Sequence, residues 1–270
     1  MKVSKLIAPC VALCLVVACS RDEPGATAEP AAEPASDPVA ITTTDADLRT
    51  LLAGDSRPEE DRARDAGRRP VDVLAFLGIE TGMAVLDVMA SGGYYTEVLS
   101  LAVGPEGSVV AHNTPGFLQF RDGYYENAIS ERLAGNRLPN VTRLNKDFAE
   151  LSAEDGQFDA AITALNFHDI YNRNGKEAAV ASLQGIGATL KPGGVLGVID
   201  HVGAPDADNA TLHRIDPALV VETATAAGFV VAGESDILGS ADDAHTLGVF
   251  DEAIRGKTDR FLLKLEKPSG

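Results

Sequence analysis

Residues 84–265 alternate between short β-branched runs and longer helical stretches, and this alternation limits the possible folds more than any other feature of the sequence. Strands separated by helical crossovers form parallel sheets with helices on both faces. The sequence therefore predicts an α/β fold with a doubly wound sheet. The predicted strands are Ala84–Val88, Ser108–His112, Val141–Leu144, Ala160–Leu165, Val195–Asp200, Phe229–Glu234 and Arg260–Leu265.

Helices are predicted between these strands and before the first of them. Asp216, Pro217 and Gly228 supply the cap, the first residue and the stop signal of the last helix. The predicted crossover helices are Tyr94–Ala102, Phe117–Leu133, Lys176–Leu190 and Asp216–Ala227. Three shorter helices, at Asp45–Ala53, after Ser56 and at Pro70–Phe76, make residues 41–78 a helical extension of a domain spanning residues 41–270.

The first 40 residues differ in composition from this domain. Lys2 and Lys5 precede an apolar run, Leu6–Ala18, which at 1.5 Å per residue is too short to cross a membrane as a helix. Residues 1–18 are therefore interpreted as a signal peptide. Residues 21–40 are rich in Ala, Pro, Glu and Asp, so residues 19–40 are predicted to form a disordered tether.

The end of the apolar run, Val16-Val17-Ala18-Cys19-Ser20, resembles the cleavage box of bacterial lipoprotein signals. That resemblance implies cleavage before Cys19, acylation of its thiol, and an exported protein anchored by lipid on the periplasmic side of the cell envelope. Ser20 in place of Asp favours the outer membrane over the inner membrane. The alternative is an ordinary secretory signal in which Cys19 is incidental.

The net charge limits the classes of partner that this chain can bind, and the cysteine content limits its disulfides. The chain has 40 acidic and 23 basic side chains, a net charge of −17, so we expect no nucleic-acid partner, because phosphate binding needs clustered Lys and Arg. Cys10 and Cys14 leave with the signal peptide, so a disulfide is not expected in the mature chain. The expected partner is a small-molecule substrate, and the sequence leaves the oligomeric state open.

A turn of small residues between Asp87 and Tyr94 joins a buried strand to a helix. In a doubly wound sheet such a turn lets a ligand approach the backbone and meet the positive end of the helix dipole. The carboxylate of Asp87 suits a cationic or hydroxyl-bearing ligand better than a pyrophosphate. The Gly-x-Gly-x-x-Gly fingerprint is absent, which makes a dehydrogenase the least favoured reading.

The stretch Val85-Leu-Asp-Val-Met-Ala-Ser-Gly-Gly-Tyr-Tyr-Thr-Glu97 resembles motif I of class I S-adenosylmethionine-dependent methyltransferases, in particular a bacterial group with a Gly-Tyr-Tyr-Thr-Glu turn. The likeness runs from about Arg57 to Pro268 and includes Leu190-Lys-Pro-Gly-Gly194 before the fifth strand. It implies a Rossmann-like, mostly parallel seven-stranded sheet with an antiparallel last strand, and S-adenosyl-L-methionine as the cofactor. It places the cofactor against Asp87, Met89, Ala90, Ser91, Gly92, Gly93, Asn113, Asp147, Phe148 and Asn166.

Two features depart from that family. Met89 and Ser91 stand where its pattern has glycine, and the second strand ends in His112-Asn113 instead of the acid that grips the ribose, although Asn113 can still accept a hydrogen bond. The leading hypothesis is a methyltransferase acting on an unidentified small molecule. These departures, and an exported location away from the cytoplasmic supply of the donor, favour the alternative of a non-catalytic binding or accessory lipoprotein.

Candidate catalytic residues follow the fourth and fifth strands. His168 and Asp169 come after one, and His201 after the other. An imidazole titrates near neutral pH, so His168 can act as a general base or orient an acceptor, with His201 in substrate binding. The alternative is that His168 packs against the sheet. Histidine and carboxylate side chains also ligate metals, but no HxxxH or HxH spacing occurs, so no metal site is predicted.

Other charged residues are interpreted as structural. Arg62, Arg64, Arg68 and Arg69 form a basic island, more consistent with a solvated helix face that pairs with neighbouring acids than with a lid over an anionic ligand. His213 and His245 are interpreted as surface residues.

Overall fold

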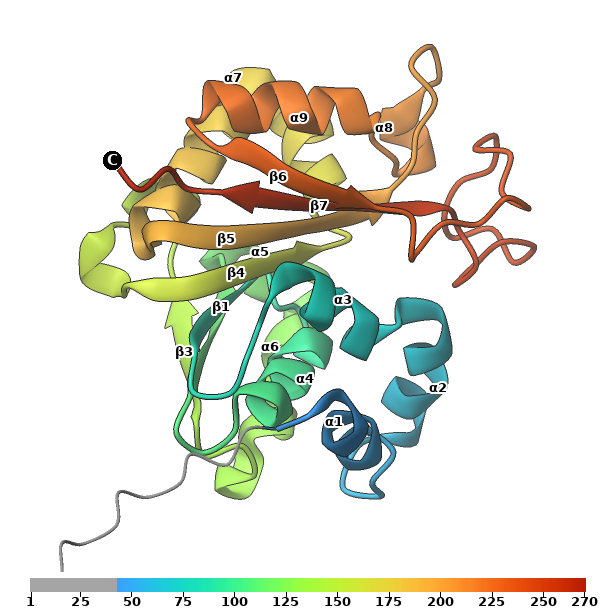
Figure 1. Ribbon diagram of the computed structural model, residues 1–270. Coiled ribbons are helices and arrows are strands. Elements are labelled where there is room, and N and C mark those ends of the chain that lie inside the picture. The colour runs from blue at the N-terminus through green and yellow to red at the C-terminus, as the bar shows by residue number, and fades with distance from the viewer. Residues whose placement is uncertain (1–42) are drawn as a thin grey trace, which may run out of the picture. The chain divides into compact units, whose positions relative to one another are not determined.

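A computed structural model describes residues 43–270, which belong to a compact unit spanning Ile41–Gly270 (Figure 1). The predicted signal peptide (residues 1–18), Cys19 and the whole of the predicted tether (residues 19–40) lie outside the described residues. Among residues 43–270, no helix combines the length and apolar character needed to cross a membrane.

Seven strands form one sheet in the order β3-β2-β1-β4-β5-β7-β6. The strands β1 to β5 are parallel, and β7 runs antiparallel to both of its neighbours. The predicted doubly wound sheet with an antiparallel last strand is thus confirmed. The strands are β1 (Ala84–Val88), β2 (Ser108–Asn113), β3 (Val141–Asn145), β4 (Phe158–Ala164), β5 (Leu190–His201), β6 (Val230–Ser235) and β7 (Arg260–Glu266).

Helices cover both faces of the sheet (Figure 1). The two faces carry α3 and α4 on one side, with α1 packed on them, and α7 and α9 on the other. The helices are α1 (Asp45–Leu52), α2 (Glu59–Arg68), α3 (Pro70–Leu77), α4 (Tyr94–Val103), α5 (Pro115–Leu118), α6 (Phe120–Leu133), α7 (Phe167–Thr189), α8 (Asn209–Leu212) and α9 (Pro217–Ala226). Short 3₁₀ helices cover residues 134–136, 148–150 and 153–155.

Successive residues of the central strands point alternately into the two hydrophobic clusters, one on each face of the sheet. Val85 of β1 and Ile162 of β4 pack in the cluster that contains α3 and α4, whereas Leu86 and Ala161 pack in the cluster that contains α7 and α9. This alternation is the two-residue period of a strand buried on both faces. It explains why the strands read as short continuous apolar runs.

Two helix predictions were wrong in detail. The helix predicted over Phe117–Leu133 is divided, because Arg121, Asp122 and Gly123 all have left-handed backbone angles inside α6. The helix predicted from Lys176 begins nine residues earlier, at Phe167, and Gly175, with φ of 84°, interrupts it. The stretch after β4 is therefore the N-terminal part of α7.

Candidate functional site

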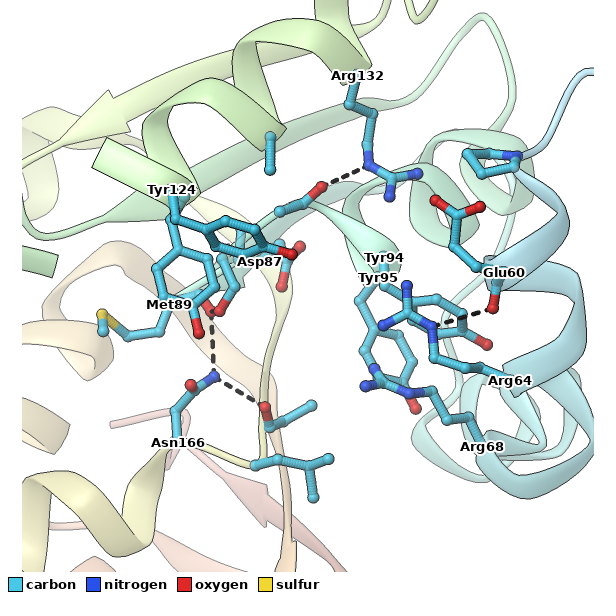
Figure 2. A pocket seen from close by; sticks show the side chains of 18 of the residues that line it. Glu60, Arg64, Arg68, Asp87, Met89, Tyr94, Tyr95, Tyr124, Arg132 and Asn166 are labelled. Atoms are coloured by element: carbon cyan, nitrogen blue, oxygen red, sulfur yellow. Dashed lines mark hydrogen bonds between the residues drawn. The ribbon is translucent and has the colours of Figure 1, made fainter. Parts of the chain in front are cut away.

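A cavity of about 990 Å³ opens at the carboxyl ends of β1, β4 and β5. It lies where the chain order of the sheet reverses between β1 and β4, which is where open α/β sheets bind ligands. Its volume is at the upper end of the about 300–1,000 Å³ that is usual for small-molecule pockets. Figure 2 shows its wall: α2 and the start of α4 form one side, and Met89, Tyr124 and Asn166 form the other.

The turn after β1 keeps the backbone of a glycine-rich loop although two of its glycines are missing. Met89, Ser91 and Gly93 have φ angles of 53°, 57° and 84°. Left-handed backbone costs a residue with a side chain about 1–2 kcal/mol, so the turn must be held by its neighbours. Asn166 Nδ2 donates to the carbonyl of Met89 at 3.1 Å. The Met89 and Ser91 side chains line the cavity and leave it open.

The predicted cofactor residues divide into those that line the cavity and those that support it. Asp87, Met89, Ala90, Ser91, Gly92 and Asn166 line it. Gly93 does not, and a Cβ there would lie 2.7 Å from Ile129 Cδ1, so this glycine lets α6 approach the turn.

Asn113 also supports the turn from outside the cavity. Its Oδ1 accepts from the backbone N–H of Ser91 at 2.9 Å, and its Nδ2 donates to the Ser91 carbonyl at 3.4 Å. Asp147 and Phe148 belong to the β3 side and are absent from the cavity lining. Phe148 instead contacts the ring of His112.

Asp87 is buried at the end of β1, where Thr96 Oγ1 donates to its Oδ2 at 2.6 Å. Burial raises the pKa of Asp87 to about 7, against the opposing effects of Thr96, Arg132 and Arg68. Near neutral pH the carboxyl is therefore balanced between its two protonation states. A cation placed beside it would favour the ionised form.

The basic island on α2 contains one arginine unlike the rest. Arg62 pairs with exposed Asp55 and Arg69 with partly exposed Asp72, whereas Arg64 pairs with buried Asp61. Arg68 instead lies with its guanidinium carbon 4.3 Å from the centre of the Tyr94 ring (Figure 2). Within residues 43–270 its guanidinium has no hydrogen-bond or ion-pair partner, and burial lowers its pKa. Arg68 is thus a partly desolvated cation that borders an open cavity.

Tyr94 links this cation to the framework. Its hydroxyl donates to Asp65 Oδ1 at 2.6 Å, and Arg57 holds the same carboxylate with contacts of 2.5 and 3.1 Å. Burial raises the pKa of Tyr95 to about 12, so the second tyrosine stays neutral. Both tyrosines are 5% exposed and both line the cavity.

The opposite end of the cavity contains a buried histidine–aspartate pair. His168 Nδ1 lies 2.7 Å from Asp200 Oδ1, and the backbone N–H of His168 donates to Asp200 Oδ2 at 2.8 Å. Burial alone lowers the pKa of His168, but the Asp200 carboxylate outweighs it and the net shift is upward. Because Nδ1 faces Asp200, Nε2 is the nitrogen left for other partners.

Two further histidines lie next to His168. The His201 ring centre is 6.0 Å from it, and burial lowers the pKa of His201 to about 3, which keeps this imidazole neutral. His213, interpreted from sequence as a surface residue, packs edge-on against His168 at 5.7 Å and is only one-third exposed. His245 is also partly buried, with Nε2 2.8 Å from Asp259 Oδ2.

Aromatic residues that the sequence reasoning missed surround the mouth of the cavity. Phe117 and Tyr125 stack at 4.3 Å, and Tyr124 and Phe250 are more than 60% exposed. No local sequence motif marks these aromatic residues. Phe117, Tyr124 and Tyr125 come from α5 and α6, and Phe250 comes from the long loop before β7. Two signals did find this cavity: Asp87 with the Gly92-Gly93 turn, and the histidines that follow the fourth and fifth strands.

No family model matches the sequence, and no curated protein matches it significantly. Solved structures do share its fold. A SAM-dependent methyltransferase from Aquifex aeolicus matches with a TM-score of 0.56 and 21% identity over 83% of this chain and 98% of that chain. The [4+2]-cyclase SpnF matches with a TM-score of 0.56 and 18% identity over 83% and 93% of the two chains.

A third match is a putative sarcosine dimethylglycine methyltransferase from Galdieria sulphuraria, with a TM-score of 0.52 and 16% identity over 78% of this chain and 88% of that chain. These identities establish the architecture alone. One of the three structures is a cyclase, so this fold alone does not specify a reaction. The chain has the Rossmann-like fold of S-adenosylmethionine-dependent methyltransferases.

Proposed function

We propose that this protein is an S-adenosylmethionine-dependent methyltransferase acting on a small-molecule acceptor. The observation that carries the proposal is the turn after β1. Its backbone keeps glycine-like angles at Met89, Ser91 and Gly93, at a cost in strain, beneath an open cavity. Strain that persists at the floor of a cavity is typical of a binding site, where the surrounding structure maintains it.

The charges around the turn fit the methionine part of the cofactor. Arg68 offers an uncommitted guanidinium for a carboxylate, and Asp87 offers a carboxyl for an ammonium group. The stacked rings of Phe117 and Tyr125 offer an apolar surface for the adenosine part. When bound, the cofactor would supply an intrinsically activated methyl group, so the protein has mainly to orient the acceptor.

The other end of the cavity is suited to hold that acceptor. His168 is fixed by Asp200, and Asp169 and His201 border the same space. Tyr124 and Phe250 at the mouth favour an acceptor with an apolar body. In this arrangement the histidines position the polar atom that receives the methyl group.

Calorimetry on the full chain with S-adenosylmethionine and its demethylated product tests the proposal. Arg68→Gln should weaken binding about 10- to 100-fold, because a charge-assisted hydrogen bond contributes about 1.5–3 kcal/mol. Arg62→Gln is the matched control on the same helix, since Arg62 pairs with exposed Asp55 and lies outside the cavity lining. Equal affinities for the two variants would contradict the assignment of Arg68.

A non-catalytic binding or accessory role is the second candidate. The observation that favours it is the orientation of Asn113, which holds Ser91 and leaves the end of β2 without the ribose-binding side chain expected there. A folded protein that produces no heat with either ligand would favour this second function.

We also propose that the protein is exported and tethered on the periplasmic side of the envelope by lipid at Cys19. The support is the sequence Val16-Val17-Ala18-Cys19-Ser20 after an apolar run. Cys19→Ser should move the protein from the membrane fraction to the soluble fraction. A protein that stays in the membrane fraction would refute the anchor.

A further inference from the structure

Three ligand groups for a metal ion converge beside the acceptor end of the cavity. His168 Nε2 lies 3.7 Å from Asp169 Oδ2, and His213 Nδ1 lies 3.6 Å from Asp169 Oδ1. The chosen ligand atoms of the three residues all lie within 4.8 Å of one another. In the part of the chain from residue 43 onward, this is the one set of three such groups.

The spacing matches the needs of a small divalent ion. Nitrogen and oxygen ligands at about 2.0–2.2 Å from a tetrahedral ion lie roughly 3.3–3.6 Å from one another. The separations of 3.7 and 3.6 Å run to different oxygens of Asp169, Oδ2 and Oδ1, and with one ligand atom per residue the three atoms lie within 4.8 Å of one another. Arg173 Nε lies 3.2 Å from Asp169 Oδ1, so Oδ2 is the oxygen freer to bind an ion. Small side-chain rotations would close the site.

Asp200 prepares His168 for this role. Metal-bound histidines usually donate their second ring N–H to a carboxylate, which fixes the tautomer and the ring orientation. Asp200 accepts from His168 Nδ1 at 2.7 Å and is itself held by the backbone N–H groups of His168 and His201, each at 2.8 Å. Nε2 is thereby left directed at Asp169.

His213 has a strained backbone, and the buried ion pair of the next residue fixes its position. It follows the last residue of α8 and has a φ of 54°, a left-handed conformation that is unfavourable for residues with a side chain. The next residue, Arg214, is fully buried and binds Asp243 through contacts of 2.9 and 3.0 Å. A residue whose strained backbone is fixed in this way meets the pattern of a functional position.

We propose that His168 Nε2, an oxygen of Asp169 and His213 Nδ1 bind one divalent first-row transition-metal ion, with zinc as the reference ion. Two imidazoles and one carboxylate form a set that such ions favour and that leaves a coordination position open. His168 and Asp169 line the cavity, so the open position is available to a ligand there. Spacing along the sequence did not indicate this site, because His213 comes from a different element.

The ion would use that position to bind an oxygen, nitrogen or sulfur atom of the acceptor and favour loss of its proton. This use rests on the proposed methyltransferase function, whereas binding of the ion does not. An acceptor with a metal-binding polar group beside an apolar body would fit both the ion and the aromatic mouth.

Titration of the metal-free full chain with Co²⁺, followed by visible absorption, tests the site without any cofactor or acceptor. Cys10, Cys14 and Cys19 are replaced by serine in every sample, so that thiolates do not compete. We expect ligand-field bands that saturate at one ion per chain, and calorimetry with Zn²⁺ should give the same stoichiometry.

His213→Asn should weaken the affinity at least about 100-fold, and Asn is chosen because it tolerates left-handed backbone. Asp200→Asn should weaken it about 10- to 100-fold with unchanged stoichiometry, as loss of an outer partner does. His245→Asn is the control, since this histidine lies outside the set. Absence of Co²⁺ bands in the folded parent, or equal affinities of the parent and His213→Asn, would overturn the site whether or not S-adenosylmethionine binds.

Discussion

The two ends of the cavity are built in different ways. At the cofactor end, Asp87 near the end of β1 and the strained turn that follows it form one short segment, and α2 adds Arg68 from nearby in the sequence. At the acceptor end, His168, Asp200 and His213 come from three separate elements spread over 45 residues. The charged groups of the first end lie close together in the sequence, although Asn113 and Asn166 hold its turn from elsewhere, and the second end is assembled by long-range packing.

This difference suggests that mutations at the two ends will have different effects. A local turn can keep its conformation while its residues change, and the left-handed angles at Met89 and Ser91 are an example. The acceptor end depends on distant contacts, since the buried pair of Arg214 and Asp243 holds the segment next to His213. We therefore expect mutations to affect affinity at the first end and stability together with geometry at the second.

The largest expected effect is at Arg214. Arg214→Met should lower the free energy of unfolding by about 3–5 kcal/mol, because it leaves the carboxylate of Asp243 buried without its partner. Urea denaturation measures the change. The control Arg62→Met breaks a solvent-exposed pair and should cost less than about 1 kcal/mol. Similar losses in both variants would show that the Arg214–Asp243 pair does not stabilise the acceptor end as described.

The next effect is a pH dependence at the cofactor end. Burial holds the pKa of Asp87 at about 7, so the carboxyl of the free protein is protonated below that pH. A bound ammonium group favours the ionised form, so binding should release a proton. Cofactor affinity should then fall by up to about tenfold for each pH unit below 7. Calorimetry at pH 5.5 and 7.5 measures this, and equal affinities would contradict a role for Asp87.

Asp87→Asn supplies the control for that experiment. The variant should bind weakly with no such pH dependence. Because the folded pKa lies above the ordinary value of 3.8, the protonated form stabilises the fold at acidic pH, and that stabilisation is lost as the pH rises to about 7. Asp87→Asn should therefore gain stability relative to the parent as the pH rises from 5 to 8. A constant difference would show that the carboxyl is not buried as described.

The smallest effect concerns the strain in the turn. Ser91→Gly should raise the free energy of unfolding by about 1 kcal/mol, because glycine adopts a φ of 57° without steric cost. Ser130→Gly, within α6, should lower it by about 1 kcal/mol. Thermal or urea unfolding of the two variants gives the comparison. A destabilised Ser91→Gly would mean that the serine hydroxyl, not the backbone, matters in the turn.

Local sequence signals predicted most of the fold. The strand β1 has the predicted bounds, and β2, β3 and β7 extend the prediction by one residue, because β-branched runs bounded by turns specify buried strands. The part of α7 before Gly175 was not predicted to be helical, although α7 begins at Phe167.

The sequence predicted site residues that follow three strands, and His168, Asp169 and His201 line the same cavity as Asp87. Asp87 and the Gly92-Gly93 turn could be found from their spacing. The uncommitted state of Arg68 could not, because it depends on which of the four neighbouring arginines meet an acidic partner. The contact of His213 with His168 could not be found either, since it depends on how α8 packs against the start of α7.

The most direct test of the account is a crystal structure of the protein grown with S-adenosylhomocysteine, the demethylated cofactor. The account predicts the ligand over residues 89–93, with its carboxylate on Arg68 and its ammonium group beside Asp87. A ligand bound elsewhere, or a turn whose Met89 and Ser91 side chains close the cavity, would contradict it.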